Sequence, residues 1–234
     1  MTKGGDIVVS RLKGLGIALA VIGLVFIAGG AYAYLRVQDG TKSLNTFSAA
    51  QNVTLTYNED GQLVDRGETA GAEAIMALLK DDWGYAVDTA ELNPNDPVVN
   101  TATEYMFQMA TVAYHTLNGT QTIVLTEDAE YKGEVFPAGT YEFAVDGRYW
   151  TAFDRQHPIE GPARAQAWTG TAHALIAELG VGVVTASTLQ LGLGVAGVAA
   201  GMGGAFFLMG VGLVWATRPE EAAVRVTERA TVRA

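Results

Sequence analysis

The sequence predicts a membrane protein in which two transmembrane α-helices flank one extracytoplasmic α+β domain. Two uncharged segments and a contrast in charge predict this fold class. Gly14–Leu35 (22 residues) and Val181–Ala216 (36 residues) contain no Asp, Glu, Lys, Arg or His. A helix of about 20 apolar residues crosses the roughly 30 Å hydrocarbon core of a bilayer, so each segment is long enough to span it.

The second uncharged segment is the stronger of the two. We place its membrane span at 191–216, preceded by a helical stem at 181–190 that carries Thr and Gln side chains. A buried helix of a soluble protein is the alternative. The span contains eight glycines, each of which costs about 1 kcal/mol relative to alanine in a helix in water. In lipid the backbone has no water to bond with and stays helical, so the glycine content favours a membrane span.

The first span is expected at 14–35, after a short basic tail at 1–13 that carries Lys3, Arg11 and Lys13. Tyr32, Tyr34 and Arg36 at its end are typical of an interfacial anchor. A signal peptide cleaved after Ala33 is the alternative, because a basic start, an apolar run and small residues also mark such peptides. The length of the run favours a retained helix.

The distribution of charge predicts the orientation. The two tails, 1–13 and 217–234, together carry a net charge of +3 and the segment between the spans carries −13, which sum to the −10 of the chain. Positive flanks stay in the cytoplasm. Both termini are therefore expected in the cytoplasm and the domain at 36–180 outside the plasma membrane. An acidic chain of this kind is also unsuited to nucleic-acid binding.

The domain is expected to mix helices with antiparallel hairpins. A helix starting at the Thr101–Glu104 capping box and ending near Leu117 has the clearest signal. Asp146-Gly147 lies between two alternating runs, which predicts a hairpin between 140–145 and 148–153. The other expected elements are helices at 37–50, 70–80 and 163–179, short strands at 53–57 and 62–64, and strands at 122–125 and 134–136.

Residues that carry chemistry are scarce, so the sequence predicts neither an enzyme nor a cofactor. There is no nucleophile elbow, phosphate-binding loop or dinucleotide fingerprint. The three histidines lack metal-ligand spacing; the weak candidates for a metal site are His115 and His157 with Glu160, or with Asp154 or Glu104 in its place. Neither span contains an ionisable residue, which argues against ion or proton transport.

Small residues four apart on the predicted spans are the most informative pattern. Such stripes let helices approach closely in lipid, and they predict packing against other membrane subunits. Gly210 lies outside the stripes, and its replacement by leucine is expected to leave assembly unchanged. The helix-packing candidates are Gly16, Ala20, Gly23, Gly192, Ala196, Gly197, Ala200, Gly201, Gly204 and Ala205.

The run from His157-Pro158-Ile159-Glu160-Gly161-Pro162 to Ala167, leading through His173-Ala174-Leu175 into the glycine-rich span, resembles a family of actinobacterial two-span membrane proteins. These are often labelled "aromatic ring-opening dioxygenase", and one is similar to an accessory subunit of the cytochrome bcc–aa3 respiratory supercomplex. The resemblance implies a non-catalytic accessory subunit of a respiratory complex. The residues themselves give the dioxygenase label no support. The alternative is a membrane-tethered domain that binds a metal or another ligand.

Overall fold

The computed structural model describes residues 3–218, with side chains from residue 7 onward. The chain divides into two compact units, one joining Met1–Gly40 to Leu189–Ala234 and the other comprising Thr41–Thr188. We call them the helix-pair unit and the pocket domain. Most of the expected tail at 217–234 lies outside the described residues.

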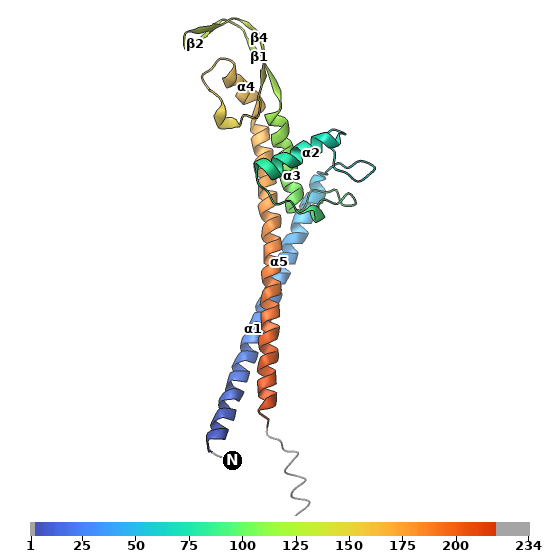
Figure 1. The fold of residues 1–234 in the computed structure, drawn as a ribbon, viewed down its shortest axis with the longest axis vertical. Helices are drawn as coiled ribbons and strands as arrows, with labels where there is room; N and C mark the ends of the chain where they lie inside the picture. Colours follow the sequence, from blue (N-terminus) through green and yellow to red (C-terminus); the bar gives the residue numbers. More distant parts are fainter. Residues whose placement is uncertain (1–2, 219–234) are drawn as a thin grey trace, which may run out of the picture. The chain divides into compact units, whose positions relative to one another are not determined.

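The helix-pair unit consists of parts of two long helices, α1 (Lys3–Gln51) and α5 (Gly170–Ala216), which lie side by side in it (Figure 1). Each is long and apolar enough to cross a membrane, and the most apolar window of each is only 17% or 11% buried. A core helix of a soluble protein would be mostly buried. The predicted spans, the helix at 37–50 and the stem at 181–190 all fall inside these two helices, which contain no proline.

The pocket domain is built on helices. Its main core joins the last turns of α1 and the first half of α5 to α2 (Thr69–Ala77) and α3 (Ala102–Leu117), with Ile75, Ala110 and Ala186 among the buried side chains. The buried Ser48 hydroxyl shares a 2.8 Å hydrogen bond with the Tyr105 hydroxyl, which ties α1 to α3. The predicted capping box at the start of α3 is confirmed.

Two antiparallel ribbons follow α3. β1 (Thr120–Leu125) pairs with β4 (Gly139–Ala144), so that Thr120 lies opposite Ala144. Between them, β2 (Ala129–Tyr131) pairs with β3 (Glu134–Phe136) across Lys132 and Gly133, both of which have positive φ. The buried Ile123 of β1 packs on Ile159 and Ala163 at the start of α4 (Glu160–Ala167).

The predicted hairpin across Asp146-Gly147 is wrong. Both residues do adopt the positive φ of a tight turn, but β4 has already paired with β1, and the segment after the turn forms the 3₁₀ helix η3 (Trp150–Ala152). Arg148 bonds Glu160 of α4 at 2.9 Å, and the Arg164 Nε of α4 donates to the Trp150 carbonyl at 3.0 Å. These contacts hold the segment after the turn against α4, so it does not pair with β4.

Two other expected elements differ in detail. The segments 53–57 and 62–64 make isolated bridges, Thr54 with Val98 and Tyr57 with Leu63, instead of regular strands. The expected helix at 163–179 is interrupted between α4 and α5, where Trp168 has ψ of 65°. Its indole nitrogen donates to the Arg148 carbonyl at 3.0 Å, so the interruption points this ring into the domain.

Candidate functional site

The helix-pair unit is held by glycines at which the two backbones nearly touch. A Cβ atom on Gly23 would clash with the backbone nitrogen of Phe207 and lie 2.6 Å from the Gly203 carbonyl oxygen. A Cβ on Gly30 would lie 2.8 Å from the Ala200 nitrogen and 2.9 Å from the Ala196 oxygen. Close approach of this kind is the geometry that small residues permit between membrane helices.

Gly210 belongs to this contact, which corrects the expectation that it stands apart. A Cβ there would clash with the Ala20 nitrogen and the Gly16 oxygen. Gly203, which the stripes omitted, faces Gly23 and Ile27 in the same way. Gly192 approaches Val37, whose Cγ2 would lie 2.8 Å from an added Cβ. The α1–α5 contact therefore uses Gly16, Ala20, Gly23, Gly192, Ala196 and Ala200 of the predicted set.

The remaining glycines of that set lie on another face of α5. Within the described residues, nothing comes within 4 Å of a Cβ placed on Gly197, Gly201 or Gly204, and the same holds for Gly194 and Gly212. At about 100° of rotation per residue, these five positions and the exposed Ala205 share one side of the helix. We call this side the open glycine face. No residue of α1 covers it in the part of the chain described.

The weak metal candidates are each engaged with other partners. The Nε2 atom of His115 lies 3.0 Å from Asp65. The Nδ1 atom of His157 accepts bonds from the backbone nitrogens of Ile159 and Glu160, and the ring packs against Tyr131 and Phe136. Glu160 accepts from Arg148 and from the Asp154 nitrogen. Among the side chains described, from residue 7 to 218, no three His, Asp or Glu residues are grouped to hold a metal ion.

Asp154 has a structural role in holding the β2–β3 ribbon. Its Oδ2 accepts a bond from the Tyr131 hydroxyl and lies 3.0 Å from Lys132 Nζ, and these two groups lower the pKa of Asp154 from 3.8 to about 2. A carboxyl whose pKa is lowered by folding stabilises the folded state above its unfolded pKa. This contribution is lost as pH falls from about 4 towards 2.

We therefore expect Asp154→Asn to loosen the ribbon at neutral pH, because the charged acceptor is removed. Amide protection factors in residues 129–136 should fall, and those of the wild-type protein should fall to the same level only near pH 2. The exposed Glu130 lies on the same ribbon, so Glu130→Gln is the control. Equal exchange in wild type and Asp154→Asn at pH 7 would show that this carboxylate does not hold the ribbon.

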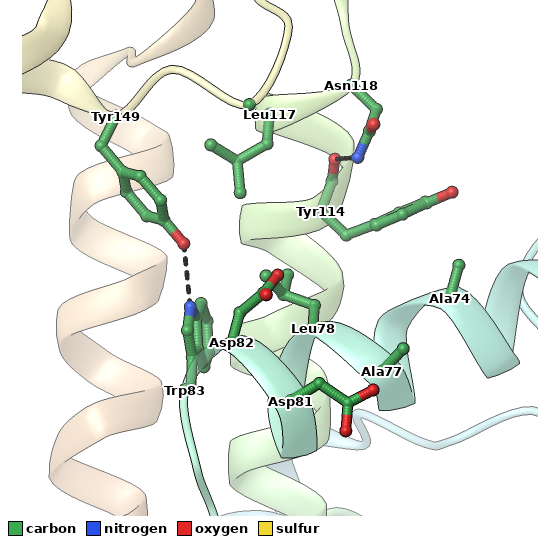
Figure 2. A pocket seen from close by; sticks show the side chains of 11 residues that line it. Ala74, Ala77, Leu78, Asp81, Asp82, Trp83, Tyr114, Leu117, Asn118 and Tyr149 are labelled. Atoms are coloured by element: carbon green, nitrogen blue, oxygen red, sulfur yellow. Dashed lines mark hydrogen bonds between the residues drawn. The ribbon is translucent and has the colours of Figure 1, made fainter.

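Two cavities that share lining residues lie side by side in the pocket domain. The larger, of about 810 Å³, we call the acidic pocket (Figure 2). It lies between the π-helix η1 (Leu78–Asp82), the end of α3 and the loop before η3. Asp81 and Asp82 are its charged residues, and both side chains are exposed. Its lining is Ala74, Ala77, Leu78, Asp81, Asp82, Trp83, Tyr114, Leu117, Asn118, Gly147 and Tyr149.

The smaller cavity, of about 440 Å³, we call the aromatic pocket. Trp168 is its buried base, with the Tyr149 ring stacked at 5.7 Å and the His173 ring at 5.7 Å. The Trp150 ring meets His173 edge-on at 4.9 Å. The lining is Trp83, Met109, Ala113, Tyr149, Trp150, Thr151, Trp168, His173 and Ile176.

Trp83 and Tyr149 line both pockets and form the wall between them. The Trp83 indole nitrogen donates to the Tyr149 hydroxyl at 2.8 Å, as Figure 2 shows. The π-helix positions Trp83, because its backbone nitrogen bonds the Leu78 carbonyl five residues earlier. The interruption before α5 and the Arg148–Glu160 pair fix the opposite side. Single-turn π-helices often occur at functional sites.

Sequence reasoning missed both pockets. Three of the four tryptophans of the chain line the pockets, and this enrichment was the available signal. The sequence alone does not show that Trp83, Tyr149 and Trp168 meet in space.

The fold and these sites define a class of protein: two helices able to cross a membrane, flanking a small domain with antiparallel ribbons and an aromatic-lined double pocket. The chain matches no protein-family profile, no curated protein and no solved structure.

Proposed function

We propose that this protein is a non-catalytic accessory subunit of a larger complex in the plasma membrane. The exposure of apolar side chains along both helices of the helix-pair unit carries the proposal. Val25, Leu35, Val198 and Leu208 are each more than 60% exposed. A soluble protein would leave this surface in water, whereas lipid and neighbouring helices can cover it.

The distribution of charge supports an orientation with both termini in the cytoplasm. The tails carry a net +3 and the intervening domain −13, and basic flanks are retained on the cytoplasmic side. The packing of Gly16 and Gly23 of α1 on α5 supports an uncleaved N-terminal helix. Cleavage after Ala33 would remove the α1 half of those contacts.

The open glycine face supports a further membrane subunit as the partner. Gly197 and Gly201 provide the flat surface that helices use in lipid, and α1 already occupies another side of α5. Together with the resemblance of residues 157–216 to the two-span actinobacterial family, this leads us to propose a respiratory complex of the cytochrome bcc–aa3 type as the assembly. Purification in mild detergent with mass spectrometry tests it. A lone monomer without a stoichiometric partner would contradict the proposal.

Replacing both Gly197 and Gly201 by leucine is expected to remove the partner while leaving the protein in the membrane. Leucine inserts more favourably than glycine, and a lost small-residue contact costs on the order of 1–2 kcal/mol, or about tenfold in association. Partner yield in co-purification is the measurement.

The matched control is Gly14→Leu with Gly29→Leu on α1, where an added Cβ also meets nothing within 4 Å of the described chain. Retention of the partner by the Gly197/Gly201 variant at the control level would show that the open glycine face is not its binding surface.

The double pocket favours a second candidate function, a membrane-tethered domain that binds a small ligand. Binding sites for small molecules are concave, largely apolar and furnished with a few polar groups. Both cavities fall in the usual range of several hundred Å³, and a bonded aromatic pair joins them. An accessory subunit that also binds a ligand would satisfy both candidates.

A further inference from the structure

The lining of the double pocket restricts the chemistry of a ligand. The aromatic pocket presents the rings of Trp150, Trp168 and Tyr149, with His173 as its titratable side chain. The acidic pocket adds two carboxylates, Asp81 and Asp82. Neither lining contains Lys or Arg among the described residues. A bound anion would therefore meet two negative charges in the acidic pocket, while Arg155 and Arg164, the cationic groups beside the aromatic pocket, already face the Trp150 ring.

The aromatic wall favours a cation directly. The face of an indole or phenol ring carries negative potential and attracts an ammonium group within about 6 Å of its centre. Trp83 and Tyr149 can both contribute, since they line the acidic pocket beside the carboxylates. The 3.0 Å approach of the Arg164 guanidinium carbon to the Trp150 ring centre is a cation contact of this kind within the chain itself.

We propose that the acidic pocket binds an organic ammonium cation with an apolar body. The cationic head lies against Trp83 and Tyr149, near Asp81 and Asp82. The apolar body lies on the same side of the wall, against Leu78 and Leu117. This proposal rests on the second candidate function and adds the class of ligand to it.

The probe is benzyltrimethylammonium, which has a fixed charge and a phenyl body. Its neutral comparison is 2-methyl-1-phenylpropan-2-ol, which has nearly the same shape without the charge. Binding is followed by quenching of tryptophan fluorescence in the full-length protein in detergent. All measurements are made in the Trp215→Phe variant. Trp215 lies in the helix-pair unit and the other three tryptophans line the pockets, so the remaining fluorescence comes from the pockets alone.

We expect the cation to bind about fivefold or more tightly than the neutral compound, a preference typical of aromatic sites for cations. Asp81→Asn with Asp82→Asn should weaken the cation by about fivefold and leave the neutral compound unchanged. Both side chains are exposed and form no side-chain hydrogen bond with the described residues, so their replacement should leave the fold intact. Glu59→Gln with Asp60→Asn, an exposed acidic pair on a turn outside the pockets, removes the same charge as a control.

The possible failures are distinguishable. Equal binding of the two probes, or equal loss in the control variant, would overturn the cation proposal and keep a ligand-binding pocket. Absence of binding by both probes would overturn the ligand-binding function itself along with the inference.

Discussion

Gly23→Leu and Gly210→Leu, each made singly, are expected to separate α1 from α5 in the helix-pair unit. An added Cβ at either position meets backbone atoms of the facing helix: Phe207 nitrogen for Gly23, and Ala20 nitrogen for Gly210. Backbone cannot rotate away as a side chain can, so the helices must part. We expect a loss of at least about 1–2 kcal/mol of helix association for each substitution.

The absence of native cysteine makes this separation easy to measure. Phe26 and Phe206 face each other across the two helices, with ring centroids 6.2 Å apart. Cysteines introduced at these two positions should be joined efficiently by a short bis-maleimide in the parent protein. Joining should fall about tenfold in Gly23→Leu and Gly210→Leu.

Each substitution has a matched control on the same helix. Gly29 on α1 and Gly212 on α5 have nothing within 4 Å of an added Cβ in the described structure. Gly29→Leu and Gly212→Leu should therefore cross-link like the parent. Parent-level cross-linking in Gly23→Leu would mean that the two backbones are farther apart than the structure places them.

Glu104→Ala is expected to give the largest loss of stability in the pocket domain. Glu104 is 2% exposed, and its Oε2 accepts from the backbone nitrogens of Asn100 at 3.0 Å and Thr101 at 2.9 Å. Alanine would leave both part-buried donors without their acceptor and abolish the capping box. We expect a cost of about 2–4 kcal/mol and a fall in Tm of about 5–10 °C.

Glu104→Gln separates the hydrogen bonds from the charge. The amide oxygen still accepts, while the buried charge is gone. Burial raises the pKa of Glu104 above its ordinary 4.5. A carboxyl with a raised folded pKa stabilises most below the unfolded pKa and loses that contribution as pH rises through the folded value. The wild-type domain should therefore lose some stability above pH 4.5, and the Gln variant should lose less.

Thermal unfolding of the full chain in detergent, followed by near-UV circular dichroism, measures both effects. The aromatic rings of the pocket domain supply most of that signal. Glu73→Ala, at an exposed position of α2, is the control. A Tm for Glu104→Ala equal to that of the control would show that this carboxylate does not support α3.

The sequence predicts the helices well because their signals are local. Uncharged runs locate the apolar parts of α1 and α5, and Thr101 with Glu104 fixes the start of α3. Hairpin pairing was less predictable. Asp146-Gly147 has the turn chemistry but not the partner strand, whereas Lys132-Gly133 forms a hairpin turn with a residue pair that carries little signal. After Asp146-Gly147, the contacts of Arg148 outweighed the local preference for a hairpin.

The helix contacts and the pockets depend on information that spacing alone lacks. The four-residue spacing of small residues placed Gly197 and Gly201 in the same predicted set as residues that contact α1. Spacing identifies residues on one face of α5 but does not tell which face meets α1. The double pocket requires η1, α3 and the loop at 149 to converge. No local pattern near Trp83 or Tyr149 encodes that meeting.

The π-helix η1 has an evolutionary consequence. A π-turn contains one residue more than an α-turn, so it corresponds to a single-codon insertion in an α-helix. In η1 the Trp83 nitrogen bonds the Leu78 carbonyl five residues earlier, and deleting the exposed Lys80 would make the same bond α-helical. Trp83 would then keep its place beside Tyr149. Relatives of this chain that lack the residue should therefore have an unbroken α-helix there and still retain the wall between the two cavities.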